Sequence, residues 1–168
     1  MIRAGFIEED EARFHKSGHF VLVGPSRGGH LTPSAKITIS NELDKIRTVQ
    51  DFVEAFCVSH NLALDLVNNI NLCLEEVLVN VINYGYDDGD VHQIDIDLAL
   101  SDCQLEISIK DDGKPFDPLQ RPDPDLEQPL EDRPIGGLGI FLLKKLMDGL
   151  EYDRREGKNI LVMKKRVT

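Results

Sequence analysis

Residues 65–84 read DLVNNINLCLEEVLVNVINY, a long apolar stretch interrupted by acidic and amide side chains. On a helix that turns about 100° per residue, the polar side chains gather within roughly 60° of one another. This polar stripe consists of Asp65, Asn69, Glu76, Asn80 and Asn83. A solvated face would explain the stripe, but solvated helix faces usually carry Lys, Glu and Arg rather than Asn. Because a helix that buries most of its surface does not bury unpartnered polar groups, the stripe predicts a helix that faces a ligand.

Two residues of the stripe, Glu76 and Asn80, are spaced i and i+4. Their side chains therefore lie one above the other and can reach the same group of ligand atoms. Carboxylate and amide oxygens suit Mg²⁺, which keeps several waters and takes few ligands from the protein. The pair therefore favours an oxygen-lined site for magnesium and a polar ligand.

The residues on either side of this helix predict an α+β fold. Apolar and polar residues alternate along 94–100 and 105–109, which is the pattern of strands with one buried face. The other predicted elements are an edge strand at 37–40, a helix at 41–59 capped by Asn41, a helix at 137–147, and a hairpin of strands at 150–155 and 160–166. Helices that precede and interrupt the strands predict a two-layer α/β sandwich, in which a mixed sheet carries helices on one face.

Length and composition fit one globular domain. The chain has 168 residues, of which 41% are hydrophobic and 29% charged, so a disordered or fibrous chain is excluded. Residues 24–34 are rich in Gly, Pro and Ser, as linkers and loops are. We therefore expect residues 1–35 to form an N-terminal extension without an assigned role and residues 36–168 to form the functional domain.

The net charge indicates which classes of partner are disfavoured, and the cysteine content indicates the redox state of the cellular compartment. Nineteen basic against thirty acidic residues give a net charge of −11, which argues against nucleic acid or an anionic membrane as a partner. Cys57, Cys73 and Cys103 form no CxxC pair, so we expect three small core residues in a reducing cytoplasm. No apolar run approaches about 18 residues, so no membrane span is expected. Residues 1–10 lack the apolar region of a signal peptide.

Two further stretches break the expected patterns. The strand at 105–109 runs into Asp111-Asp112-Gly113, and a rigid strand end can hold a carboxylate that accepts a hydrogen bond from an exocyclic amine such as that of adenine. Residues 115–134 contain six of the eight prolines and no periodic pattern, as a functional loop would. This loop leads into Gly136-Gly137-Leu138-Gly139 at a helix start, where glycines let backbone N–H groups approach a phosphate.

In this order, the three stretches resemble the boxes of the GHKL (Bergerat-fold) ATP-binding superfamily. Residues 75–86 look like its N box, residues 111–117 like its first glycine box and residues 136–140 like its second. Within the superfamily the closest likeness is to the bacterial anti-sigma-factor serine/threonine kinases, of which the run GLGIFLL at 137–143 is typical. The likeness covers roughly residues 36–166 and implies the Bergerat version of the predicted sandwich, with ATP between the long helix and a lid.

The resemblance implies a role for each box. Glu76 would be the general base, and Asn80 would hold Mg²⁺ against the phosphates of ATP. Asp111 would bind the adenine amine, and residues 115–135 would form the lid. Arg133 lies near the position at which a lid arginine would meet the γ-phosphate, at an offset that differs from the usual one. The implied nucleotide-binding residues are Asn80, Asn83, Asp111, Gly113, Phe116, Gly136, Gly137, Leu138 and Gly139.

The resemblance also implies an ATP-dependent serine/threonine kinase of a partner-switching pathway. Members of the family phosphorylate a small antagonist protein of the STAS type and, as homodimers, sequester a sigma factor, which regulates transcription. The first alternative is an ATP-sensing module that binds partners without phosphorylating them. The second is the catalytic fragment of a histidine kinase, which is disfavoured because residues 1–60 show no pattern of a dimerising helix pair. Glu76 favours the kinase over the pure binder, because binding ATP and Mg²⁺ does not need a base.

Overall fold

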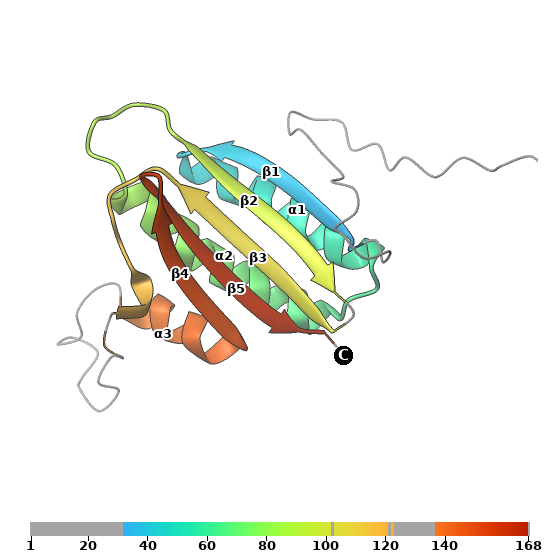
Figure 1. Cartoon of the computed structure of the whole chain (residues 1–168). Helices are drawn as coiled ribbons and strands as arrows, with labels where there is room; N and C mark the ends of the chain where they lie inside the picture. Colours follow the sequence, from blue (N-terminus) through green and yellow to red (C-terminus); the bar gives the residue numbers. More distant parts are fainter. Residues whose placement is uncertain (1–31, 102, 121, 123–136, 168) are drawn as a thin grey trace, which may run out of the picture.

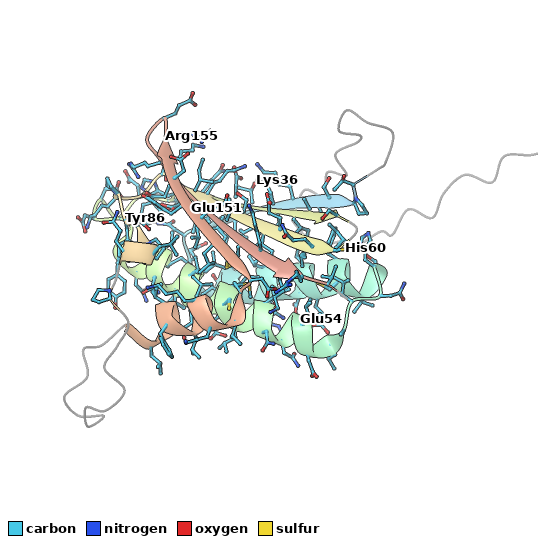
Figure 2. All side chains as sticks on the ribbon, turned by 60° about the horizontal axis from the view of Figure 1, so that its bottom comes forward. Lys36, Glu54, His60, Tyr86, Glu151 and Arg155 are labelled. Atoms are coloured by element: carbon cyan, nitrogen blue, oxygen red, sulfur yellow. The ribbon has the colours of Figure 1, made fainter. Side chains whose placement is uncertain are left out.

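The protein folds into two layers, a five-stranded sheet and the described helices that cover one of its faces (Figure 1). The computed structural model describes residues 32–101, 103–120, 122 and 137–167. Along the chain the elements are β1 (Ser34–Ser40), the 3₁₀ turn η1 (Leu43–Lys45), α1 (Ile46–Ser59), α2 (Leu64–Tyr84), β2 (Gln93–Ser101), β3 (Gln104–Asp111), the 3₁₀ turn η2 (Pro118–Gln120), α3 (Gly137–Leu146), β4 (Gly149–Arg155) and β5 (Lys158–Arg166). Figure 2 shows Lys36 and Glu151 on the open side of the sheet and Glu54 on the outer side of the helical layer. The predicted α+β sandwich with helices on one face is confirmed.

The expected mixed sheet is corrected to an antiparallel one, because every pairing between the described strands is antiparallel. The order of the strands is β1-β2-β3-β5-β4. Since α1 and α2 together return the chain to the end where β1 finished, β2 runs back along β1. The connection from β3 to β4 contains one helix, α3, and β3 and β4 run in the same direction, as strands joined by a helical crossover do. However, β5 lies between these two strands and runs opposite to both, so no neighbours are parallel.

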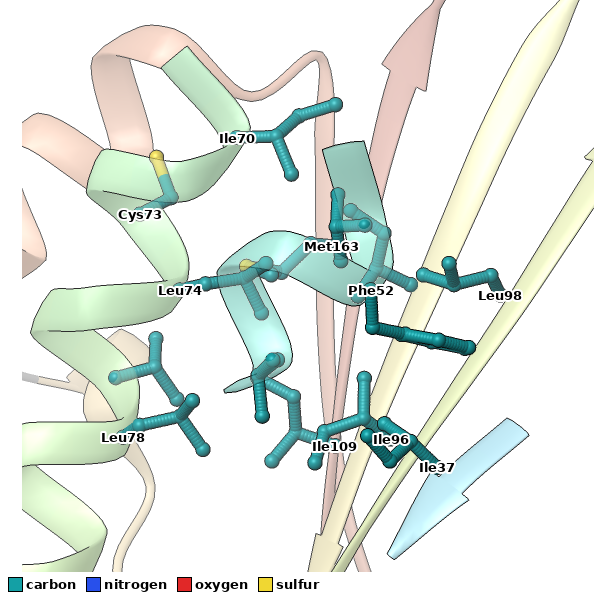
Figure 3. Packing of buried hydrophobic residues seen from close by; sticks show 14 of the residues in the cluster. Ile37, Phe52, Ile70, Cys73, Leu74, Leu78, Ile96, Leu98, Ile109 and Met163 are labelled. Carbon is teal, nitrogen blue, oxygen red and sulfur yellow. The ribbon is translucent and has the colours of Figure 1, made fainter. Parts of the chain in front are cut away.

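The hydrophobic core lies between the sheet and α2, with α1 beside it (Figure 3). On β2 and β3, six alternate side chains face the helices and are at most 1% exposed: Ile94, Ile96, Leu98, Leu105, Ile107 and Ile109. On α2, Leu74 and Leu78 are fully buried and point toward the sheet. Because this apolar face fixes the rotation of α2, Glu76 and Asn80 of the polar stripe are turned toward the first turn of α3. No helix in the described part of the chain combines the length and apolar character that crossing a membrane requires.

Asn41 does not cap α1, contrary to the expectation from the sequence. The 3₁₀ turn η1 precedes the helix, and the residue before this turn makes no side-chain cap. Instead, Asn41 Oδ1 accepts a hydrogen bond from the His92 N–H at 3.0 Å, and Asn41 Nδ2 donates to the Asp90 carbonyl at 3.3 Å. The amide therefore ties the end of β1 to the loop before β2.

The cysteines divide between core and surface. Cys57 and Cys73 are buried, as expected, whereas Cys103 is exposed in the turn between β2 and β3, so its assignment to the core was wrong. Burial raises the pKa of the Cys57 and Cys73 thiols to about 11. Both therefore stay un-ionised and pack as small apolar side chains.

Candidate functional site

A mostly apolar cavity of about 200 Å³ opens between α2, the first turn of α3 and one end of the sheet. It is lined by Val77, Asn80, Val81, Tyr84 and Gly85 on or just after α2, by Ile109, Asp111, Tyr152, Asn159 and Leu161 of the sheet, and by Lys114, Pro115, Phe116, Pro118 and Ile140. An apolar pocket with a few convergent polar groups is the usual form of a small-molecule site. Its walls and its size suit a planar heterocycle.

Asp111 is the acidic group of this cavity. It is the last residue of β3 and only 5% exposed, whereas the neighbouring Asp112 is exposed. Asp111 Oδ1 accepts hydrogen bonds from the Gly113 N–H at 2.9 Å and from Asn159 Nδ2 at 2.8 Å. Burial raises the pKa of Asp111, and these two hydrogen bonds oppose that rise because they stabilise the ionised carboxylate. Of the two aspartates, Asp111 is therefore the one placed to accept a ligand amine.

Gly113 lets two chain segments approach closely. A Cβ at this position would lie 2.8 Å from Asp111 Oδ1 and 2.9 Å from the carbonyl oxygen of Gly85. The Lys114 N–H donates to the same carbonyl at 2.8 Å. The residue after α2 is thereby joined to the turn after β3, and together they form one wall of the cavity.

Glu76 lies where α2 meets α3, which begins at Gly137. A Cβ on Gly139 would overlap the carboxylate of Glu76, with the Cδ atom at 2.6 Å and the Cγ atom at 3.0 Å. Glycine therefore allows the first turn of α3 to approach the carboxylate this closely. Glu75, by contrast, faces α1, where its Oε2 accepts a hydrogen bond from Gln50 Nε2 at 3.2 Å. Of the two adjacent glutamates, Glu76 is the one directed at the glycine-rich helix start.

Asn80 can offer one oxygen to a metal ion. Its Nδ2 donates to the Glu76 carbonyl, one turn earlier on α2, at 2.7 Å, which leaves Oδ1 for a ligand. Within the described ranges, no group of three or more His, Cys, Asp or Glu side chains is arranged to hold a metal. A single amide oxygen suits Mg²⁺, which keeps its waters and takes phosphate oxygens as further ligands. The residues present therefore fit a Mg²⁺ ion that arrives with a nucleotide.

The remaining predicted site residues are not all brought to the cavity. Phe116 lines it and is 40% exposed. Leu138 is 53% exposed and Asn83 is also exposed, and neither lines the cavity. Residues 121 and 123–135 of the predicted lid, including Arg133, lie outside the described residues, and so does the predicted nucleotide-binding residue Gly136.

Two residues that reach the site from the last hairpin, Asn159 and Tyr152, were missed by the sequence analysis. Asn159 Nδ2 lies 2.8 Å from Asp111 Oδ1, and Tyr152 donates to Asn159 Oδ1 at 2.8 Å. A signal for Asn159 was present in the sequence. Asn159 lies on the buried face of β5 together with Leu161 and Met163. A polar side chain therefore occupies a position at which the alternation along the strand predicts an apolar one.

A second cluster of charged groups surrounds His92, beside the turn that carries Asp111. His92 Nε2 lies 3.0 Å from Asp88 Oδ2 and Nδ1 lies 3.0 Å from Asp112 Oδ1. The ring of Tyr86, labelled in Figure 2, stacks on the imidazole with 4.2 Å between centroids. The hydrogen bonds to Asp88 and to Asp112 raise the pKa of His92, because both favour the protonated ring. When it is protonated, His92 therefore joins the loop after α2 to the turn after β3 through two ion pairs.

His92→Gln is expected to remove a pH-dependent part of the stability. Because the pKa is raised above its ordinary value of 6.5, this contribution is fully present below 6.5 and is lost as the pH rises through the folded-state pKa. The free energy of unfolding should therefore differ more between wild type and variant at about pH 5.5 than at about pH 9, as urea unfolding would measure. A difference of equal size at both pH values would contradict the role given to the imidazolium.

The chain belongs to the histidine kinase-like ATPase domain family, whose model matches residues 39–165. This match includes all three boxes on which the resemblance to the GHKL superfamily was based, and it confirms that resemblance.

Among individual proteins, the chain is similar to serine/threonine-protein kinase BtrW of Bordetella bronchiseptica, with 32% identity over 94 residues, which cover 56% of this chain and 66% of that protein. It is also 32% identical over 106 residues to serine-protein kinase RsbW of Bacillus cereus, covering 61% of this chain and 66% of that one. The chain therefore spans just under two thirds of the length of these curated relatives.

A solved structure supports the fold. The crystal structure of the RsbU and RsbW domains of Rv1364c from Mycobacterium tuberculosis matches with a TM-score of 0.58. The match covers 82% of this chain and 33% of that chain at 17% identity. At this identity the likeness concerns the architecture alone.

Proposed function

We propose that this protein is an ATP-dependent serine/threonine protein kinase that phosphorylates a small antagonist protein of the STAS type and regulates transcription by partner switching. The proposal assigns residues 36–168 to the kinase domain, in the cytoplasm. It is supported by membership of the histidine kinase-like ATPase family and by the relatives named serine-protein kinases. Sequestration of a sigma factor by a homodimer belongs to the same proposal.

The observation that carries the proposal is the position of Glu76 against Gly139. The start of a helix attracts phosphate groups through its free N–H groups and its dipole. With the purine at Asp111, in the cavity, the phosphates would extend toward the first turn of α3. A carboxylate held at that helix start has no use in binding an anion, because it repels phosphate. It is useful for orienting and deprotonating a hydroxyl group.

In the proposed reaction, Glu76 accepts the proton of a serine or threonine hydroxyl of the antagonist. The hydroxyl oxygen attacks the γ-phosphorus of ATP, the bond from this phosphorus to the bridging oxygen breaks, and ADP leaves. Bound Mg²⁺, with Asn80 as its protein ligand, would neutralise charge on the phosphates. Catalysis would then rest on positioning and charge stabilisation, as in other phosphoryl transfers.

The test is incubation of the purified protein with γ-labelled ATP and a STAS-type antagonist, preferably one encoded beside it. The proposal expects label on a serine or threonine of the antagonist and none when the acceptor residue is replaced by alanine. A protein that binds ATP and the antagonist but transfers no phosphate would instead be the ATP-sensing switch module.

A further inference from the structure

The side-chain amide of Asn159, in the wall of the cavity, is fully hydrogen bonded. Its Oδ1 accepts from Tyr152 Oη at 2.8 Å and from Arg154 Nη1 at 2.6 Å. Its Nδ2 donates to Asp111 Oδ1 at 2.8 Å and to the Lys114 carbonyl at 2.9 Å. Because the Arg154 guanidinium can only donate, the end of the amide that it meets must be the oxygen, to which the Tyr152 hydroxyl then also donates. The NH₂ group is therefore held toward Asp111.

The orientation of Asn159 decides what Asp111 can offer to a ligand. Asp111 Oδ1 already accepts two hydrogen bonds, from Asn159 and from the Gly113 N–H, so Oδ2 is left for the cavity. Both donors favour the ionised carboxylate over the protonated one. Burial raises the pKa of Asp111, and the charge of Arg154 opposes that rise because it favours the ionised form. Arg154 Nη1 also donates to the Gly113 carbonyl at 3.1 Å, which holds the guanidinium beside the turn after β3.

We propose that Tyr152 and Arg154 are positioning residues which, through Asn159, hold Asp111 as a hydrogen-bond acceptor and thereby select a 6-amino purine over a 6-oxo purine. An ionised carboxylate accepts from the amino group of adenine and repels the carbonyl oxygen of hypoxanthine or guanine. If Asn159 were free to rotate, its oxygen could face Asp111 and favour a protonated carboxyl, which would donate to a 6-oxo group. The proposal rests on the proposed function in one respect, namely that Asp111 receives the purine.

The test measures dissociation constants for ATP, ITP and purine riboside triphosphate, which carry an amino group, an oxo group and a hydrogen at position 6 of the base. ITP also carries a proton on N1, so the comparison of ATP with purine riboside triphosphate isolates the amino group. The wild type is expected to bind ATP at least about tenfold more tightly than the other two, as one hydrogen bond to a charged group allows. Tyr152→Phe keeps the ring that lines the cavity and removes the hydroxyl. Tyr152→Phe and Arg154→Met should each weaken ATP binding several-fold and leave purine riboside triphosphate unchanged, so that the preference falls.

The chain offers a matched control for each variant. Tyr86→Phe removes a buried hydroxyl that has no hydrogen-bond partner among the described residues. Arg155→Met removes an exposed guanidinium that pairs with Asp153 instead. Both controls should keep the wild-type preference for ATP.

Asn159→Asp is expected to lower the preference for ATP over ITP in the same direction as Tyr152→Phe and Arg154→Met, and by a larger factor. It places a second carboxylate beside Asp111, and two carboxylates at this distance share a proton. The protonated member can then donate to a 6-oxo group, so the ratio of ITP affinity to ATP affinity should rise at least about tenfold.

The outcomes separate this proposal from the proposed function. If Tyr152→Phe and Arg154→Met weaken ATP and purine riboside triphosphate by the same factor, their role is structural and the proposal is overturned. It is equally overturned if both variants keep the full preference for ATP. If the wild type itself binds all three nucleotides equally, the placement of the purine at Asp111 is wrong, and the proposed function loses its nucleotide site.

Discussion

Glu76→Gln is expected to lose phosphotransfer to the antagonist by at least about 100-fold while binding ATP within about tenfold of the wild-type affinity. A positioned base is worth about 10²–10⁴ in rate, and glutamine keeps the shape of the side chain but cannot accept the proton. The carboxylate lies against Gly139 at the helix start where the phosphates are expected, so it would meet the attacking hydroxyl there. Transfer of labelled phosphate and calorimetric ATP binding would be measured on the same preparation.

Two other α2 variants sharpen this experiment. Glu75→Gln is the matched control, because Glu75 accepts a hydrogen bond from Gln50 of α1 and should have little effect on transfer. Asn80→Ala is expected to lose both transfer and tight Mg-ATP binding, because its amide oxygen is the implied ligand of the metal. If Glu76→Gln transferred phosphate at the wild-type rate, the base would be another residue and the assignment of Glu76 would be wrong.

The elements that build the core could be predicted from the sequence, because burial leaves a period in it. The helix predicted to end near Tyr84 is α2, and the alternation along 94–100 and 105–109 corresponds to β2 and β3. The last hairpin was also predicted, but its second strand was expected from 160 and begins at Lys158, because Glu156 and Gly157, with positive φ angles of 52° and 79°, form a two-residue turn. In each case a local pattern was sufficient.

The contacts that complete the site depend on residues far apart in the chain, and no local rule reveals them. Asn41 has the residue type of a helix cap, yet its amide oxygen pairs with the backbone of His92, 51 residues later. Asn159 lies 48 residues from Asp111 and meets it because β5 inserts between β3 and β4. The same insertion makes the sheet antiparallel. Predicting the contact between Asn159 and Asp111, or the antiparallel sheet, would therefore have required knowledge of the strand order.

Asp111→Asn is expected to weaken ATP binding by on the order of 100-fold, while Asp112→Asn should leave it within a few-fold. The hydrogen bonds around Asp111 make the substitution informative. Gly113 N–H and Asn159 Nδ2 both donate to Oδ1, so an asparagine at 111 would turn its oxygen toward these donors. Its NH₂ group would then face the cavity and meet the amino group of adenine, donor against donor.

Asp112→Asn is the matched control, because Asp112 is exposed and its carboxylate contacts His92 rather than the cavity. Calorimetric titration with ATP at constant pH would measure both variants, and thermal unfolding would verify that each is folded. Asp111→Ala adds a second comparison, since it removes the acceptor without introducing a donor and should bind ATP better than Asp111→Asn does. Equal affinities for the Asp111 and Asp112 variants would show that the purine does not lie at Asp111. A loss confined to Asp111, and larger for asparagine than for alanine, is the result that only an acceptor facing the amino group predicts.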